Sequence, residues 1–132
     1  LDGVHVLIVE DDTDSRNVLA VLLQRLGALV EAGASAKEAY DRIAHRRPDG
    51  VVWDIGMPEE DGYSLIRRLR QMNGARKLPA IALTAYARKQ DADAALGAGY
   101  DCHLPKPVTP ADLVRAIKSV TGERQPNQAP SA

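Results

Sequence analysis

The sequence lacks most of the features that would point away from a plain globular domain. A single cysteine, Cys102, excludes an internal disulfide and a cysteine-ligated zinc site, and we interpret it as a small apolar residue in a strand. No apolar run approaches the roughly 20 residues of a membrane span, and the N-terminus shows no signal-peptide pattern. The net charge of −1 does not favour nucleic acid or a membrane surface as a partner. These absences predict a cytoplasmic protein.

The length of 132 residues predicts one domain, over residues 1–121. A chain of this size buries about two thirds of its unfolded surface and needs no covalent staple. The remaining segment, 122–132, contains no large apolar residue and is expected to be disordered. Because the chain begins with Leu1 rather than methionine, we interpret it as a fragment of something longer.

Five short apolar runs alternate with five segments of helical periodicity. The runs have the composition of strands buried on both faces, and they are Val4–Val9, Leu29–Ala32, Val51–Asp54, Ala80–Thr84 and Tyr100–Leu104. Helix signals lie between them, such as a capping box at Ser35 and Glu38 and a stop at Gly27. Short connections from helix to strand require parallel pairing with helices on both faces. The predicted class is therefore α/β.

Three of the expected helices have a clear apolar face, and that of the last consists of Leu113, Val114, Ile117 and Val120. The face of the first consists of Val18, Leu19, Leu22, Leu23 and Leu26. In the helix after Gly62, the core-facing residues are Leu65, Ile66, Leu69 and Met72. The same helix carries Arg67, Arg68 and Arg70, which we expect to face solvent. We interpret this cluster as a solvated surface rather than a nucleic-acid patch, because the domain has no net positive charge.

Polar side chains collect where the expected strands end. They are Glu10 and Asp11 after the first strand, Asp54 on the third, Thr84 on the fourth and Lys106 after the fifth. In a parallel sheet these ends share one rim, where open α/β sheets bind ligands. Three carboxylates would repel one another there, and a hard divalent cation such as Mg²⁺ would relieve this repulsion. A lysine and a hydroxyl beside the metal would suit a phosphoryl group.

The ordered set of motifs resembles the receiver domain of two-component response regulators over about Val4–Val120. The matching segments are LIVEDD at Leu7–Asp12, DIGMPEEDG at Asp54–Gly62, ALTA at Ala82–Ala85 and LPKPV at Leu104–Val108. The resemblance implies a flavodoxin-like (βα)5 three-layer sandwich with strand order 2-1-3-4-5. Both ends of the match look most like receivers at the C-terminal end of hybrid sensor histidine kinases. A stand-alone regulator is the alternative.

The resemblance also implies a metal site with a phosphoacceptor at its centre. Asp54 would accept the phosphoryl group. Asp11 and Asp54 would bind Mg²⁺ directly, together with the backbone carbonyl of Gly56. Glu10 would act on the metal through water.

The remaining implied roles concern the phosphoryl group and its source. Thr84 and Lys106 would contact the phosphoryl oxygens, and the Lys106–Pro107 bond resembles the family's cis peptide. The donor would be a phosphohistidine on a histidine kinase or histidine phosphotransfer domain. Water would hydrolyse the acyl phosphate. We expect a conformational switch rather than an enzyme, with homodimerisation through the face of the fourth and fifth helices as a further expectation.

Several positions depart from the commonest family pattern. His103 stands where the family usually has Tyr or Phe, and with Thr84 it would form the switch pair. Gly56 and Tyr86 occupy two positions that tune hydrolysis, so the resemblance does not fix the rates. Trp53 is large for its place, and we interpret it as core packing. Our hypothesis is that His103 contributes to partner recognition but not to phosphoryl transfer; the alternative is a surface residue with no part in switching.

Three other functions fit the same residues less well. A phosphohydrolase of the haloacid dehalogenase type needs a second Asp two residues after the nucleophile, where this chain has Gly56. A flavodoxin-type FMN carrier needs a hydroxyl- and glycine-rich phosphate loop, whereas Asp11 and Asp12 would repel a phosphate. A degenerate receiver acting only as a docking module is disfavoured because all five site residues are present.

Overall fold

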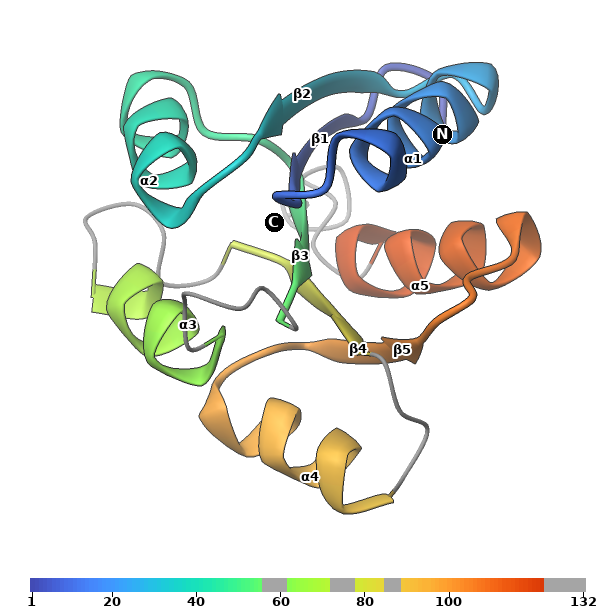
Figure 1. Ribbon diagram of the computed structural model, residues 1–132. Coiled ribbons are helices and arrows are strands. Elements are labelled where there is room, and N and C mark those ends of the chain that lie inside the picture. The colour runs from blue at the N-terminus through green and yellow to red at the C-terminus, as the bar shows by residue number, and fades with distance from the viewer. Residues whose placement is uncertain (56–61, 72–77, 85–88, 123–132) are drawn as a thin grey trace, which may run out of the picture.

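The computed structural model describes residues 1–55, 62–71, 78–84 and 89–122 (Figure 1). Its five parallel strands form one sheet in the order β2-β1-β3-β4-β5. The strands are β1 His5–Val9, β2 Leu29–Gly33, β3 Gly50–Asp54, β4 Ala80–Thr84 and β5 Cys102–Pro105. The predicted fold class and strand order are confirmed.

Five helices cover the two faces of this sheet. They are α1 Thr13–Arg25, α2 Ala36–His45, α3 Gly62–Gln71, α4 Lys89–Ala98 and α5 Pro110–Gly122. Helices α1 and α5 pack on one face, and α2, α3 and α4 pack on the other (Figure 1). Among the described residues, no helix combines the length and apolar character needed to cross a membrane.

Local side-chain chemistry begins and ends the helices where the sequence predicts. The carboxylate of Asp12 caps α1 by accepting from the Ser15 N–H at 2.8 Å. Ser35 caps α2 by accepting from the Glu38 N–H at 3.2 Å. Gly27, which follows α1, has a φ of +96°, in the region that favours glycine. The cap at Asp12 matters for the site, because it starts α1 directly after the acids that end β1.

The core has one layer on each side of the sheet. Trp53 is fully buried on the side of α2, α3 and α4, with its ring centroid 6.0 Å from that of Tyr40. Its predicted role in core packing is confirmed. The apolar face of α1 is narrower than predicted: Leu19 and Leu23 are buried, but Val18 is 66% exposed. One residue is a turn of about 100° around a helix, which takes Val18 beyond the stripe that meets the sheet.

The prediction that Arg70 faces solvent is wrong. Its guanidinium donates to the carbonyl of Gly99 at 2.8 Å, to the carbonyl of Leu78 and to Asp101 Oδ2 at 3.0 Å. Asp101 Oδ2 also accepts from the Ala80 N–H at 2.8 Å. Arg70 therefore ties the C-terminal part of α3 to the segments that lead into β4 and β5. Its neighbours Arg67 and Arg68 are exposed, as predicted.

Strand β5 begins later than expected. Tyr100 is buried, but its N–H donates to the carbonyl of Ala95 at 3.1 Å, so it closes α4 rather than opening the strand. Cys102 lies within β5 and packs with the α1 and α5 layer, in agreement with its interpretation as a small apolar residue. Partial burial raises the pKa of its thiol above the ordinary value.

Candidate functional site

The three predicted acids meet at the carboxyl-end rim of the sheet. Strands β1 and β3 are neighbours, with Val9 paired to Trp53, so the residues that follow these two positions come together. Oxygens of Glu10, Asp11 and Asp54 lie within 4.8 Å of one another. Glu10 and Asp54 are buried, whereas Asp11 is exposed at the mouth of the site.

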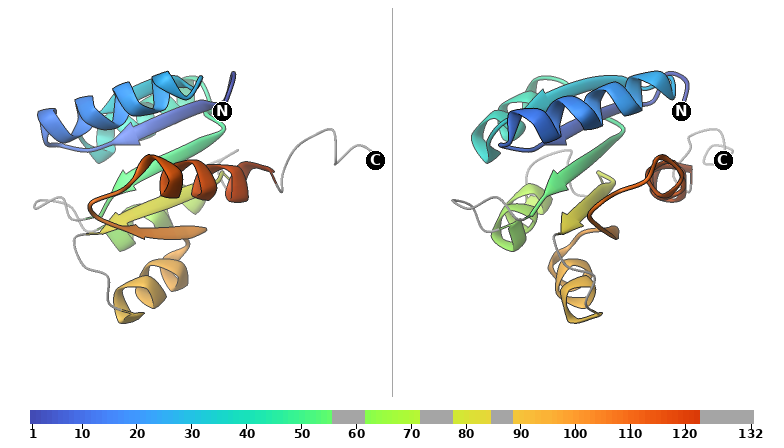
Figure 2. Two further views of the ribbon diagram at one scale, coloured as in Figure 1. Left: turned by 90° about the vertical axis from the view of Figure 1, so that its right-hand side faces the viewer. Right: turned by 45° about the vertical axis from the view of Figure 1, so that its right-hand side comes forward.

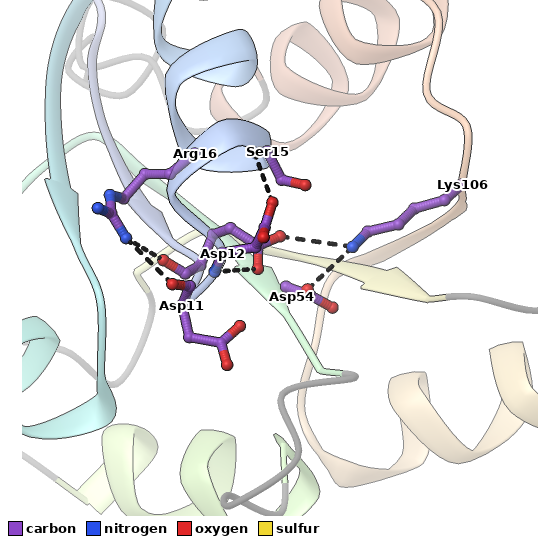
Figure 3. A network of polar contacts seen from close by, with 7 residues as sticks. Asp11, Asp12, Ser15, Arg16, Asp54 and Lys106 are labelled. Carbon is purple, nitrogen blue, oxygen red and sulfur yellow. Dashed lines mark hydrogen bonds and ion pairs between the residues drawn. The ribbon is translucent and has the colours of Figure 1, made fainter.

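Lys106 reaches this acidic cluster from the segment after β5 (Figure 3). Its Nζ donates to Asp54 Oδ2 at 2.9 Å and lies 3.4 Å from Glu10 Oε1. Partial burial lowers the pKa of the ammonium, but the hydrogen bond and charge of Asp54 outweigh it, so the pKa lies above its ordinary value. The backbone N–H of Lys106 donates to the carbonyl of Thr84 at 2.8 Å, and the Lys106–Pro107 bond is cis, as the resemblance implies.

Glu10 has a pKa far above its ordinary value. Burial, followed by its contact with the Asp54 carboxyl, raises the pKa of Glu10 from 4.5 to about 7. The Asp12 N–H, which donates to Glu10 Oε2 at 3.1 Å, and the charge of Lys106 offset part of this rise. The cluster therefore relieves its surplus negative charge partly by holding a proton.

Arg16 was not identified from the sequence, yet it anchors the loop that presents the acids (Figure 3). Its guanidinium donates to the carbonyl of Glu10 at 2.9 Å and is 3.4 Å from the carbonyl of Asp11. A signal was available, because Arg16 lies in the first turn of α1, where the helix dipole disfavours a cation. A cation there indicates a nearby acceptor that outweighs this penalty.

Thr84 and His103 form a second pair beside the acids. His103 pairs with Ala82 in the β4–β5 register, so Thr84 is its diagonal neighbour on the same face of the sheet. The distance from Thr84 Oγ1 to His103 Nε2 is 2.7 Å. Sequence reasoning predicted both positions as a switch pair, but it did not predict a direct hydrogen bond.

The described residues thus bring together Glu10, Asp11, Asp54, Thr84 and Lys106, with His103 joined through Thr84. The predicted ligand carbonyl of Gly56 and the tuning position Tyr86 lie outside the described residues, as do Met72 and the segment 123–132. The acidic donors are all carboxylate oxygens, which suit hard cations rather than metals that prefer sulfur.

Comparison with known proteins agrees with this geometry. Residues 6–118 match the family described as response regulator receiver domain. An uncharacterized 14.6 kDa protein of Leptolyngbya boryana is 44% identical over 89% of this chain and 90% of its own length. The response regulator MprA of Mycobacterium sp. (strain KMS) is 36% identical over 98% of this chain, which spans only 55% of MprA.

Solved structures show the same relationship. A putative response regulator from Chloroflexus aurantiacus is 33% identical with a TM-score of 0.86, covering 92% of this chain and 99% of the other. The receiver domain of a sensor histidine kinase from Pseudomonas aeruginosa PAO1 has a magnesium ion coordinated in its active-site cleft. It is 34% identical with a TM-score of 0.82, covering 91% of this chain and 98% of its own. By sequence and by fold, the chain belongs to the receiver domain family of two-component signalling. Members of this family are switches that depend on phosphorylation.

Proposed function

We propose that this rim binds Mg²⁺ and that Asp54 accepts a phosphoryl group from a phosphohistidine on a histidine kinase or histidine phosphotransfer domain. The observation that carries the proposal is the contact of Lys106 Nζ with Asp54 Oδ2 at 2.9 Å inside a cluster of three carboxylates. One ammonium offsets only part of that negative charge. The cluster thus retains a surplus of negative charge, which a divalent cation would neutralise. A divalent cation next to a lysine can stabilise the charge of a transferring phosphoryl group.

Asp54, Lys106 and Thr84 each have a distinct role in the proposed reaction. An oxygen of Asp54 attacks phosphorus, the new P–O bond forms, and the P–N bond breaks with its electron pair staying on the leaving imidazole. Lys106 offsets the charge on the phosphoryl oxygens, and Thr84 donates its hydroxyl proton to one of them. Water then attacks phosphorus and restores the Asp54 carboxylate. When bound, Mg²⁺ would be held by Asp11, Asp54 and, through water, Glu10, and it would neutralise charge on the transferring group.

Labelling with acetyl phosphate and Mg²⁺ tests the acceptor. We expect intact-mass measurement to show one added phosphoryl group that is removed by base. Asp54→Asn should abolish the addition, because an amide is a poor nucleophile and carries no charge for the metal. Asp14→Asn, an exposed position in the first turn of α1, is the matched control and should label like the parent. Full labelling of the Asp54→Asn variant would place the acceptor elsewhere.

Mg²⁺ binding is tested separately by calorimetry. We expect weak binding, since few fixed protein ligands leave most of the metal's hydration in place. Asp11→Ala should bind Mg²⁺ much less tightly than the parent. Unchanged binding by that variant would show that the metal assignment is wrong. Trp53 is buried beside Asp54 in the chain, so its fluorescence provides an independent titration signal.

We also propose that the domain is a receiver of a hybrid sensor histidine kinase and that it dimerises through α4 and α5. The kinase context is supported by the similarity to the Pseudomonas receiver, whereas the 44% identity to the Leptolyngbya boryana protein, of which 90% is covered, supports the stand-alone alternative. The coding sequence upstream of Leu1 decides between them. Sedimentation of the phosphorylated protein tests the dimer, and a monomer at all concentrations would exclude it.

A further inference from the structure

His103 contacts the site through one atom of Thr84. The 2.7 Å separation of Nε2 and Oγ1 is at the short end of the hydrogen-bond range. Thr84 is buried and His103 is half-buried, and both belong to regular strands rather than to a loop. The sheet therefore fixes this contact, and the imidazole acts on the hydroxyl at close range.

The direction of this hydrogen bond decides what Thr84 can donate. A threonine hydroxyl has one proton, and an imidazole nitrogen offers either an N–H or a lone pair. If Thr84 donates to Nε2, its only proton is committed to the ring. If Nε2–H donates to Oγ1, the hydroxyl proton is not committed to the ring, and Thr84 can donate it to an anion at the rim. Phosphoryl recognition by Thr84 requires the second arrangement.

The charges in the site favour that second arrangement. Oxygens of Glu10, Asp11 and Asp54 cluster at the same rim, and a single nearby ammonium, that of Lys106, offsets only part of their charge among the described residues. A field of this sign orients neighbouring dipoles with their protons toward the acids. An imidazole N–H directed at Oγ1, followed by an O–H directed at the rim, is a series of two dipoles aligned with that field.

We propose that His103 is a positioning residue for phosphoryl transfer: its Nε2–H donates to Thr84 Oγ1 and thereby turns the hydroxyl proton toward the phosphoryl group on Asp54. The inference rests on the proposed function, because it needs a phosphoryl group at Asp54. It replaces the expectation from the sequence that His103 takes no part in phosphoryl transfer, because the direct contact with Thr84 could not be predicted there. A phenylalanine at this position has no donor and could not hold the hydroxyl in this way.

Nitrogen-15 NMR of the imidazole rings is the direct test. The chain has three histidines, so His5 and His45 serve as internal references. With acetyl phosphate and Mg²⁺ present, we expect His103 Nε2 to carry a proton. An unprotonated Nε2 in the phosphorylated protein would overturn the proposal. Intact-mass measurement on the same sample reports whether Asp54 is modified at all, and a parent protein that never labels contradicts the proposed function instead.

Labelling rates supply a second test that a purely structural role would not pass. His103→Phe should label about three- to tenfold more slowly, the worth of one hydrogen bond. His103→Gln, whose amide can donate, should recover most of the rate. His45→Phe, an exposed position on α2, should label like the parent.

A double-mutant cycle identifies the route of the effect. In a Thr84→Val background, His103→Phe should have no further effect on the rate, because His103 acts through the hydroxyl. An equal loss in both backgrounds would overturn the proposal. Urea unfolding of each variant separates a loss of fold from a loss of positioning, and if His103→Phe does not fold, the NMR result on the parent decides.

Discussion

Lys106 and Arg70 each bind loop residues of this domain, and they lie at opposite ends of the sheet. Lys106 belongs to the carboxyl-end rim and contacts the carboxylates of Asp54 and Glu10. Arg70 belongs to the other end, where it contacts backbone carbonyls and Asp101. The side chain of Lys106 is 36% exposed, and that of Arg70 is 18% exposed.

The difference shows how the groups that a cation contacts distinguish a functional cation from a structural one. The planar guanidinium of Arg70 is matched to acceptors that cannot move or titrate, such as the carbonyls of Leu78 and Gly99. Lys106 is a compact charge on a flexible stem, and its partners can gain a proton or a ligand. Arg70 is therefore suited to holding the fold, and Lys106 to exchanging partners during a reaction.

The largest effect is expected from Arg70→Met. This change removes the guanidinium from two partly buried carbonyls and from the ion pair with Asp101, so the free energy of unfolding should fall by about 2–4 kcal/mol. Urea unfolding measures it. Arg67→Met on the exposed face of the same helix is the control and should change stability by less than about 0.5 kcal/mol. A small effect of Arg70→Met would show that its contacts are not structural.

At the acidic rim, Glu10 should cause the free energy of unfolding of the metal-free protein to fall as pH rises. Folded Glu10 keeps its proton up to a pH of about 7, whereas the unfolded chain releases it near 4.5. The folded state therefore binds the extra proton between these values, and the free energy of unfolding falls as pH increases through this window. The loss is at most on the order of 3 kcal/mol.

Unfolding in EDTA at several pH values tests this dependence, with Glu10→Gln as the comparison. The amide does not titrate, so the variant should lose this part of the pH slope. A parent whose stability is flat between pH 5 and 7 would contradict the raised pKa of Glu10.

A smaller effect is expected from Gly99→Ala. Gly99 has a φ of +130°, which residues with a Cβ rarely adopt, and its carbonyl accepts from Arg70. An added Cβ would also lie 3.4 Å from Ile66 Cγ1. The cost should be about 1–2 kcal/mol, measured by urea unfolding. A neutral result would mean that this turn relaxes without disturbing the Arg70 contacts.

Lys106→Met should have the smallest effect on stability, less than about 1 kcal/mol, because the ammonium is partly exposed and its partners can protonate. Labelling by acetyl phosphate should nevertheless fall sharply, since the charge on the phosphoryl oxygens loses its partner. A variant that is destabilised as much as Arg70→Met, or one that labels normally, would remove the distinction between the two cations.

The sequence predicted the sheet and the site more securely than it predicted individual contacts. Strand ends and capping residues are local signals, so the rim that holds Asp54 and Lys106 followed from pattern alone. The role of Arg70 depends on Leu78 and Gly99, carbonyls distant in the chain, and charge alone suggested a solvated residue. The Thr84–His103 hydrogen bond depends on the register of two strands, which no local pattern specifies. The cytoplasmic location stays a prediction.

The path of the chain through the sheet also has an architectural consequence. The strands point away from the first and last described residues, which lie at the end opposite the acidic rim (Figure 2). Thr121, near the end of α5, lies against Gly50 at the start of β3. The two ends are thus separated from the rim by about the length of a strand, roughly 16 Å for five residues. A polypeptide that continued directly from either described end would start on the side of the sheet opposite the rim, and its starting point would leave the rim open to a phosphoryl donor.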